Sequence, residues 1–508
     1  MIDRAILIHV PSRWAGGEND IPIGLLYVAG VLEQMNIEVR IYDIYLKKIP
    51  TDDPYGWAEL QREIQDFKPQ LIGFGGIATS YMWTKKLSRR IKTHYPDIFQ
   101  IAGGALSSAF DLLLTRTAVD AVFHGEIELT LPEVIERIRS GRPWQTVLGI
   151  SCLGPTGVQR NAPGPQVKHL DDIPIPPYHL IDIEDYLLAS DNFLAAYRAD
   201  MEDQGLYADI ARRLEDVPAF LPIVSSRGCT NKCSFCYRQQ RGYRKHSVDY
   251  IIRHIDYLKE KFGVKGISFR DELFNGNEKW VLALCDTLIA RDQDIAYITS
   301  ARADRLSTTM LRKMYRSGCV DLLFGQESGS PKILKEYRKN VTPAQNLRAT
   351  LLTRAAGIYS TVQIVIGSPG ENEHTIAETT AFLQQAGIRH FSLNYLIPLP
   401  EAPIWEYVQE NNLIPDVEHY LETVARIGGE PLINLTRVPD RQWRLWGKQI
   451  TFKVQFYYAV KHKLFFTCVR LLVTYPLKVW IPPKIKPRLR EILSRALPIP
   501  RLRAWLNV

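Results

Sequence analysis

The sequence has few cysteines and histidines, and most of its cysteines are isolated. The 508 residues include 7 Cys and 11 His. An odd number of cysteines, four of them scattered along the chain, does not form the framework of a small disulfide-rich secreted protein. We therefore expect reduced thiols, and metal chemistry where the cysteines cluster.

The sequence also lacks a long apolar run and a secretory leader. No stretch reaches the ~18 uncharged apolar residues that a membrane-spanning helix needs. The first residues, MIDRAILIHVPSRW, have neither a basic start nor a small-residue cleavage site, so we expect a cytoplasmic protein. With 46% hydrophobic and 23% charged residues, the chain has the composition of a globular protein, and its length predicts several domains.

Acidic residues are almost absent from the C-terminal segment. Residues 451–508 contain twelve Lys or Arg and one acid, Glu491, so this segment accounts for the net charge of +8 on the whole chain. Aromatic and aliphatic residues alternate with the basic ones over 449–508, a pattern of either a helix lying at a membrane surface or a helical cap with a solvated basic face. Nucleic-acid binding is not favoured, since the apolar content is high and no familiar nucleic-acid module is visible.

Two series of strands and helices follow one another along the chain. The first predicts a parallel sheet of βαβ units, and the second, six strands with helix-sized gaps, predicts a (β/α)6 partial barrel. In both architectures the functional groups lie at the C-terminal ends of the strands. The predicted strands are 5–10, 38–44, 71–76, 100–104 and 120–125 in the first series, and 222–227, 266–271, 295–301, 320–326, 361–367 and 390–397 in the second.

Three of the seven cysteines lie together in the stretch SSRGCTNKCSFCYRQQ, residues 225–240. Cys229, Cys233 and Cys236 have the spacing C-x3-C-x2-C, without a fourth ligand nearby, whereas a structural zinc site needs four. Three thiolates on a [4Fe-4S] cluster leave one iron open to a small molecule. The missing fourth ligand therefore favours an iron-sulfur cluster that acts on a bound molecule.

This loop resembles that of the radical S-adenosylmethionine (SAM) superfamily, which has the same cysteine spacing with an aromatic residue, here Phe235, before the last cysteine. The resemblance implies that SAM chelates the open iron and that its reductive cleavage gives a 5'-deoxyadenosyl radical, which abstracts hydrogen from a substrate. It implies no catalytic side chain. The implied SAM contacts are Tyr237 after the last cysteine, Asp271 and Glu272 in FRDELFNGN, Glu327 and Ser328 in FGQESGS, Arg338 in EYRKNVT and Gly367 in IGSPGEN.

The N-terminal half resembles the cobalamin-binding domain that precedes many radical SAM barrels. The stretches that carry the resemblance are IPIGLLYVAGVLE, DFKPQLIGFGG, IAGGALSS and VFHGEIELTLPEVI. A corrin is a broad disc and needs a floor of small residues with backbone donors, although such loops can equally be turns without a ligand. Cobalamin domains in which a histidine binds the lower face of cobalt carry the motif D-x-H-x-x-G, and residues 1–140 contain no such motif. We therefore expect His9 and His124 to be packed or rim residues and not cobalt ligands. The residues expected in the floor are Gly75, Gly76, Gly103, Gly104, Ser107 and Ser108.

Together these observations predict an α/β protein with four parts. Residues 1–142 form a Rossmann-like cobalamin-binding domain, 143–217 a linker, 218–410 the radical SAM barrel and 411–508 a basic helical region. The expected function is methylation of an unactivated carbon on a hydrophobic small molecule or lipid-like substrate, with an external electron donor such as flavodoxin or ferredoxin. Peripheral membrane contact through 449–508 is the alternative to a helical cap.

Two other functions remain open at this stage. One is an oxidative cyclase of the anaerobic magnesium-protoporphyrin type, which uses the same cofactors, and the other is a non-catalytic cobalamin or iron-sulfur sensor. Methylthiotransferases are disfavoured because they carry three more N-terminal cysteines, and residues 1–150 contain none. The segment IPLPEAPIW has Glu401 and Ala402 where many relatives have a Pro-Gly-Thr turn, so relatives do not define the substrate.

Overall fold

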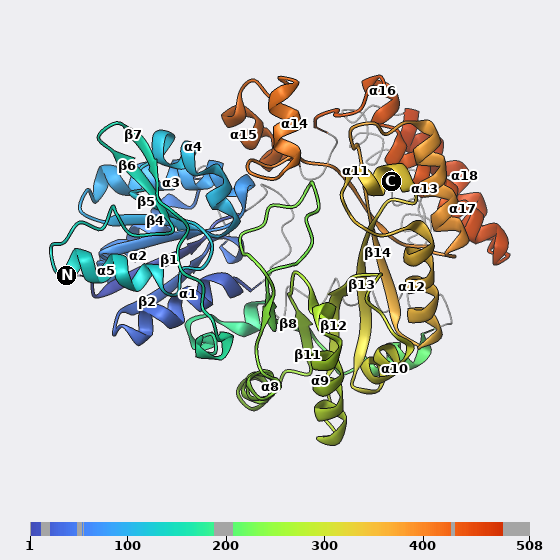
Figure 1. The fold of residues 1–508 in the computed structure, drawn as a ribbon, viewed down its shortest axis with the longest axis horizontal. Helices are drawn as coiled ribbons and strands as arrows, with labels where there is room; N and C mark the ends of the chain where they lie inside the picture. Colours follow the sequence, from blue (N-terminus) through green and yellow to red (C-terminus); the bar gives the residue numbers. More distant parts are fainter. Residues whose placement is uncertain are drawn as a thin grey trace, which may run out of the picture.

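The computed structural model describes residues 2–11, 21–47, 53, 55–186, 207–427 and 432–480. An N-terminal α/β unit, blue to cyan in Figure 1, lies beside a half-open barrel of green to yellow strands, and orange to red helices of the C-terminal region lie across both. No helix in these ranges is long and apolar enough to cross a membrane. The architecture confirms the predicted α/β class with two parallel-stranded units.

The N-terminal sheet has seven strands in the order β2-β1-β3-β4-β5-β6-β7, of which β1 to β5 are parallel. Residues 5–8 of β1 are at most 1% exposed, as expected for a strand with both faces covered by helices. The strands are β1 (Arg4–His9), β2 (Glu38–Asp43), β3 (Leu71–Gly75), β4 (Phe99–Gly103), β5 (Ala121–Phe123), β6 (Ile150–Gly154) and β7 (Gly157–Arg160). The helices between them are α1 (Ile23–Gln34), η1 (Ile44–Leu46), α2 (Trp57–Phe67), η2 (Ala78–Ser80), α3 (Tyr81–His94), η3 (Gly104–Ala109), α4 (Phe110–Arg116) and α5 (Thr130–Arg139).

The expected linker, 143–217, differs from the observed structure at its start. Strands β6 and β7 come from this segment and pair antiparallel with the edge of the N-terminal sheet. The residues Gly154 to Gly157, GPTG, which resemble a linker in composition, form the turn of this hairpin, with Gly157 at a φ of 119°. After it come η4 (Leu170–Asp172), η5 (Tyr178–Leu180) and α7 (Ala208–Arg213).

The second unit is a six-stranded parallel sheet in the order β15-β14-β13-β12-β11-β8, as the sequence predicted. Its strands are β8 (Phe220–Ile223), β11 (Gly266–Phe269), β12 (Ala296–Ala301), β13 (Cys319–Glu327), β14 (Tyr359–Ile366) and β15 (Ser392–Tyr395). The short hairpin β9 (Ser226–Arg227) and β10 (Arg244–Lys245) follows β8. The helices are α8 (Val248–Phe262), η6 (Phe274–Gly276), α9 (Glu278–Ala290), α10 (Thr308–Arg316), α11 (Pro331–Glu336), α12 (Pro343–Ala355) and α13 (Glu373–Gln385).

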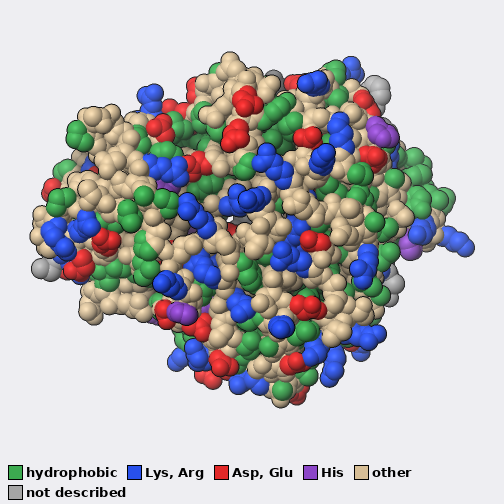
Figure 2. All heavy atoms as spheres, viewed as in Figure 1, with side chains coloured by type: hydrophobic (Ala, Val, Ile, Leu, Met, Phe, Trp, Pro, Cys, Tyr) green, Lys and Arg blue, Asp and Glu red, His purple; other side chains and the backbone are tan. Residues whose placement is uncertain are grey.

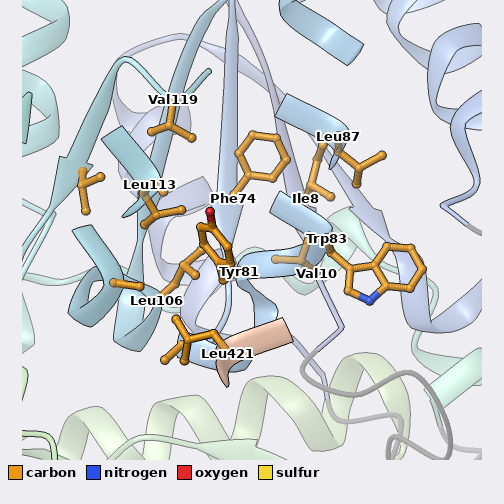
Figure 3. Packing of buried hydrophobic residues seen from close by; sticks show 14 of the residues in the cluster. Ile8, Val10, Phe74, Tyr81, Trp83, Leu87, Leu106, Leu113, Val119 and Leu421 are labelled. Carbon is orange, nitrogen blue, oxygen red and sulfur yellow. The ribbon is translucent and has the colours of Figure 1, made fainter. Parts of the chain in front are cut away.

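The C-terminal helices pack on both units. Leu421 of α15 enters the core of the N-terminal unit beside Tyr81 and Leu106 (Figure 3). Glu418 of the same helix accepts hydrogen bonds from Tyr81 Oη at 2.6 Å and Lys85 Nζ at 2.5 Å. The shared core therefore holds the two units together. The helices are α14 (Ile404–Glu410), α15 (Val417–Ile427), α16 (Asp440–Trp443), α17 (Trp446–Lys461) and α18 (Phe465–Trp480).

Candidate functional site

The three clustered cysteines lie in the loop between β9 and β10, directly beyond the C-terminal end of the first barrel strand. Cys233 is buried, Cys229 is half-buried and Cys236 is exposed, and all three are free thiols. Gly228 opens the loop at a φ of 80°, where a Cβ would collide with the Gly242 carbonyl oxygen. The sequence therefore needs glycine at this position to close the loop.

The three thiols lie in one loop, and their role as cluster ligands stays a prediction from their spacing. In the described residues no three His, Cys, Asp or Glu side chains converge to hold a single metal ion, whereas the ligands of a cubane cluster bind at separate corners. Burial raises the pKa of Cys233. Desolvation by the surrounding protein atoms, followed by the neighbouring Cys233 and Glu272, raises the pKa of Cys236 to about 11, although the Cys236 side chain still reaches solvent. Lys339 opposes both shifts, so a cation lies close to the place where thiolates must form.

Asp271 and Glu272, predicted as SAM contacts, have different surroundings. Asp271 is buried and accepts hydrogen bonds from the backbone nitrogens of Ser225 at 2.7 Å and Ser226 at 2.8 Å, as well as from the Ser225 hydroxyl. Burial raises its pKa to about 6. Asp271 thus fixes the backbone that leads into the cysteine loop. Glu272 lines the large cavity described below and is open to a ligand.

Glu327 and Ser328 stand at the end of β13. Glu327 has a φ of 63° and accepts a hydrogen bond from Lys339 Nζ at 2.8 Å. Ser328 is buried, with its Oγ 3.0 Å from Thr379 Oγ1 on α13, and therefore ties the strand end to a helix. The structure brings Glu327 towards the cysteine loop, since Lys339 Nζ also lies 5.9 Å from the centre of the Phe235 ring.

Two basic side chains near Cys233, Lys339 and Arg302, were not among the predicted SAM contacts. Arg338 is exposed, whereas the adjacent Lys339 is directed into the site. Arg302, at the end of β12, is buried and donates from Nη2 to the Lys339 carbonyl oxygen at 2.9 Å and from Nε to Asp304 Oδ1 at 2.8 Å. Sequence reasoning missed Arg302, although its position directly after a predicted barrel strand was a usable signal.

Gly367 follows β14 at a φ of 98°, as expected for a strand end that a side chain would obstruct. Its backbone nitrogen donates to Glu371 Oε2 at 2.5 Å, and a Cβ on it would lie 3.1 Å from Nε1 of Trp443 on α16. Glu371 is 2% exposed, and burial raises its pKa to about 7. The end of β14 is thus shaped by a buried acid and covered by a C-terminal aromatic ring.

A cavity of about 430 Å³ lies between the N-terminal sheet and the cysteine loop. Gly75, Gly76, Gly103 and Gly104 line it from the ends of β3 and β4. A Cβ on Gly75 would collide with the Leu25 side chain, so glycine is needed at this position. The four glycines give the cavity the floor of small residues that was predicted for a corrin. Residues of the barrel unit close the opposite side, namely Val224, Ser226, Arg227, Gly228, Gln239, Gln240, Arg270 and Glu272.

Ser107 and Ser108, expected in this floor, are buried and do not line the cavity. Ser107 Oγ lies 3.0 Å from Tyr237 Oη, and Ser108 Oγ donates to the Ala105 carbonyl oxygen at 2.9 Å. Their hydroxyls stabilise the start of α4 and its contact with the cysteine loop. Tyr237, predicted as a SAM contact, is thereby a link between the two units.

Ion pairs join the loop 124–130 to the β9–β10 hairpin. Arg227 pairs with Glu128 at 2.6 Å and with Glu126 at 3.6 Å, and Arg244 pairs with Glu126 at 2.6 Å. Both carboxylates and Arg227 are at most 8% exposed. This loop belongs to the stretch VFHGEIELTLPEVI, which resembles the cobalamin-binding domain, and the structure shows that its acids hold the cysteine loop against the sheet.

The two N-terminal histidines are held by neighbouring side chains. His9 lines the cavity, with its Nδ1 3.0 Å from Asp43 Oδ2, and Tyr186 donates to the same oxygen at 2.5 Å. His124 Nε2 lies 2.8 Å from Ser151 Oγ, and burial lowers the pKa of His124 to about 4. His124 also lines a second cavity of about 400 Å³, which shares Gly125, Glu126 and Gln239 with the first.

Comparison with known families agrees with this geometry. Residues 17–135 match the B12 binding domain and residues 223–383 match the radical SAM superfamily. An uncharacterized methyltransferase of Pyrococcus horikoshii is 26% identical over 78% of this chain and 80% of its own length. The anaerobic magnesium-protoporphyrin IX monomethyl ester cyclase of Rubrivivax gelatinosus is 23% identical over 82% of this chain and 72% of its own.

The fold also matches a solved structure, that of the radical SAM methyltransferase TsrM from Kitasatospora setae with tryptophan and a SAM analogue bound. Its TM-score is 0.63 at 16% identity, over 80% of this chain and 76% of TsrM. The protein is thus a radical SAM enzyme with an N-terminal B12-binding domain. More particularly, it is a cobalamin-dependent radical SAM enzyme, whose domains imply a [4Fe-4S] cluster, SAM and cobalamin.

Proposed function

We propose that this enzyme transfers a methyl group to an unactivated carbon of a hydrophobic small molecule or lipid-like substrate. The observation that carries the proposal is the shared cavity, which the glycine floor of the B12-binding domain and the base of the cysteine loop line from opposite sides. A methyl donor and a radical generator need such a common space. The likeness to the Pyrococcus horikoshii methyltransferase supports the same activity.

Each group of residues has a proposed task in this reaction. Cys229, Cys233 and Cys236 hold the cluster. The Glu272 carboxylate accepts hydrogen bonds from the ammonium group of SAM. Lys339, which follows α11, and Arg302, which follows β12, bind the carboxylate of SAM, since both are largely buried cations beside the cysteine loop. Asp271 positions the cysteine loop through its bonds to Ser225 and Ser226.

The cofactors supply the reactive groups, a 5'-deoxyadenosyl radical from SAM at the cluster and a methyl group on cobalamin. Overall, R–H, two SAM molecules and two electrons give R–CH3, methionine, 5'-deoxyadenosine and S-adenosylhomocysteine, which balances atoms and charge. The two electrons must come from outside the chain. We propose a cytoplasmic flavodoxin or ferredoxin as the donor.

The apolar character of the cavity supports a hydrophobic substrate. Leu7, Ile101 and Phe123 line its sheet side, and Val224 lines its barrel side. Ile77, also in the lining, is 44% exposed and can contact a ligand without any rearrangement. Burial of apolar substrate surface against those side chains that a corrin leaves uncovered contributes roughly 25 cal/mol per Å² to binding.

Labelled SAM provides the test. The purified chain is reconstituted anaerobically with iron, sulfide and hydroxocobalamin, then incubated with methyl-deuterated SAM, a reductant and a lipid extract of the source organism. We expect an extract component that is heavier by one labelled methyl group, together with equal amounts of 5'-deoxyadenosine and S-adenosylhomocysteine. The Cys233→Ala variant serves as the control and should form neither the labelled product nor 5'-deoxyadenosine.

Oxidative cyclisation is the second candidate, because the Rubrivivax gelatinosus cyclase matches over a similar share of the chain. In the same experiment a cyclase gives a product that has lost hydrogen or gained oxygen and carries no label. It also forms 5'-deoxyadenosine without stoichiometric S-adenosylhomocysteine. That result would replace methyl transfer by ring oxidation and leave the cofactor assignments unchanged.

A further inference from the structure

The last two helices of the described chain form a hairpin on the outer side of the barrel unit. Helix α17 buries Trp446, Ile450 and Val454 in a core shared with α13, and α18 packs on α17 (Figure 1). Residues 462–464 connect the two helices. One face of α17 thus anchors the hairpin firmly, while its connection and the start of α18 are exposed to solvent.

Exposed apolar side chains are concentrated in this hairpin. The described residues contain ten exposed large hydrophobic side chains, and five of them lie between 457 and 472. Phe465 and Phe466 are the most exposed of the ten, at 71% and 77%, with ring centres 5.8 Å apart. Isolated exposed apolar residues are normal, but a cluster of this kind marks a contact surface. The five are Tyr457, Val460, Phe465, Phe466 and Leu472.

The charges beside these side chains have one sign. Lys461, His462 and Lys463 are exposed one residue before the phenylalanine pair, and the sequence contains no Asp or Glu from residue 441 to residue 480. In the space-filling view, hydrophobic, basic and histidine side chains gather at the right-hand edge, where Figure 1 draws the hairpin (Figure 2). The surface therefore fits an anionic partner that also accepts apolar side chains.

A lipid bilayer combines these two properties. Lysine side chains can keep their ammonium groups among phosphates while neighbouring rings enter the acyl boundary. We propose that the tip of the α17–α18 hairpin, residues 460–466, docks the enzyme on an anionic membrane surface. Phe465 and Phe466 insert below the headgroups, and Lys461 and Lys463 pair with lipid phosphates. The inserted part is a tip, since no helix in the described ranges can span a bilayer.

The test is flotation of the full-length, cluster-reconstituted enzyme with vesicles. The vesicles are phosphatidylcholine alone or phosphatidylcholine mixed with phosphatidylglycerol. We expect the enzyme to float with the mixed vesicles and high salt to weaken the association, because each basic residue near an anionic surface adds on the order of 1 kcal/mol, about 5-fold in partition. Phe465→Ser with Phe466→Ser should lower the partition at least ~10-fold. Lys461→Glu with Lys463→Glu should lower it by a similar factor.

A matched control uses Leu148→Ser with Leu153→Ser. These leucines are 49% and 53% exposed on the N-terminal unit, so the change removes similar apolar surface elsewhere and should leave flotation unchanged. Equal flotation with both vesicle types, no flotation, or flotation that survives the phenylalanine changes overturns the proposal. The proposal is also overturned if light scattering detects a concentration-dependent dimer that the phenylalanine variant does not form. In that case the surface binds a second copy of the chain.

Discussion

Glu126 and Arg244 form a buried ion pair, 2.6 Å between Oε1 and Nη2, that joins the B12-binding domain to the hairpin holding the cysteine loop. The Glu126 side chain has no solvent exposure, and its Oε2 also accepts from the Val167 backbone nitrogen at 2.7 Å. This pair fixes one wall of the cavity relative to the other. The position of the cysteine loop relative to the glycine floor therefore depends on this ion pair.

Removal of this contact should loosen the cavity. Arg244→Ala leaves Glu126 buried with a weaker partner, and losing one member of a buried pair costs about 3 kcal/mol. We expect a lower free energy of unfolding by urea and less cobalt bound per chain. Arg241→Ala, at an exposed position in the same loop, is the control and should change neither quantity. Unchanged stability and cobalt content in Arg244→Ala would show that the shared core alone holds the domains.

Lys339 and Arg338 are the two neighbouring candidates for the cation that binds the SAM carboxylate, and variants of each can distinguish them. A charge-assisted hydrogen bond is worth roughly 1.5–3 kcal/mol, so Lys339→Ala should weaken SAM binding by about 10- to 100-fold. Arg338→Ala should leave it unchanged, because Arg338 is exposed. Equilibrium dialysis of SAM against the reconstituted enzyme measures both. If Arg338→Ala weakened SAM binding and Lys339→Ala did not, Arg338 would be the residue that binds the SAM carboxylate.

A side chain at Gly75 should block the corrin floor without disturbing the cluster. Its Cβ would collide with Leu25 at the edge of the cavity, so Gly75→Val should abolish cobalt uptake. Iron per chain, about four for one cubane cluster, should stay at the wild-type level. Metal analysis after reconstitution measures iron and cobalt per chain. Full cobalt loading in Gly75→Val would place cobalamin elsewhere.

Glu371 should give the stability of the barrel unit a distinct pH dependence. Burial raises its pKa from the usual 4.5 to about 7, so the folded state holds this proton more tightly than the unfolded state. Stability should therefore fall as pH rises from about 4.5 to about 7, by on the order of 1–3 kcal/mol. Glu371→Gln keeps an acceptor for the Gly367 nitrogen and should flatten this part of the curve. Urea unfolding at several pH values gives the free energy of unfolding of the wild type and of Glu371→Gln. If it changes with pH in the same way for both proteins, Glu371 is not the group responsible.

Much of the architecture was readable from local sequence patterns. The strands of both sheets were predicted to within one or two residues at most ends, because buried parallel strands are apolar runs bounded by glycine and polar residues. The hairpin of β6 and β7 was missed, since its turn residues Gly154 and Gly157 have the composition of a linker. Only the pairing of β6 with β5 in the folded structure distinguishes a hairpin from a linker at this position.

In the candidate site, too, some features could be predicted from local sequence and others could not. Cysteine spacing is a local property of one loop, so the sequence alone was enough to predict that Cys229, Cys233 and Cys236 act together. The glycines of the floor were also recognisable, because they follow strand ends directly. Whether a polar side chain is free for a ligand or already bonded depends on contacts between distant segments. The tertiary structure alone decided that Asp271 supports a backbone turn, that Ser107 bonds to Tyr237, and that Lys339 rather than Arg338 is directed into the site.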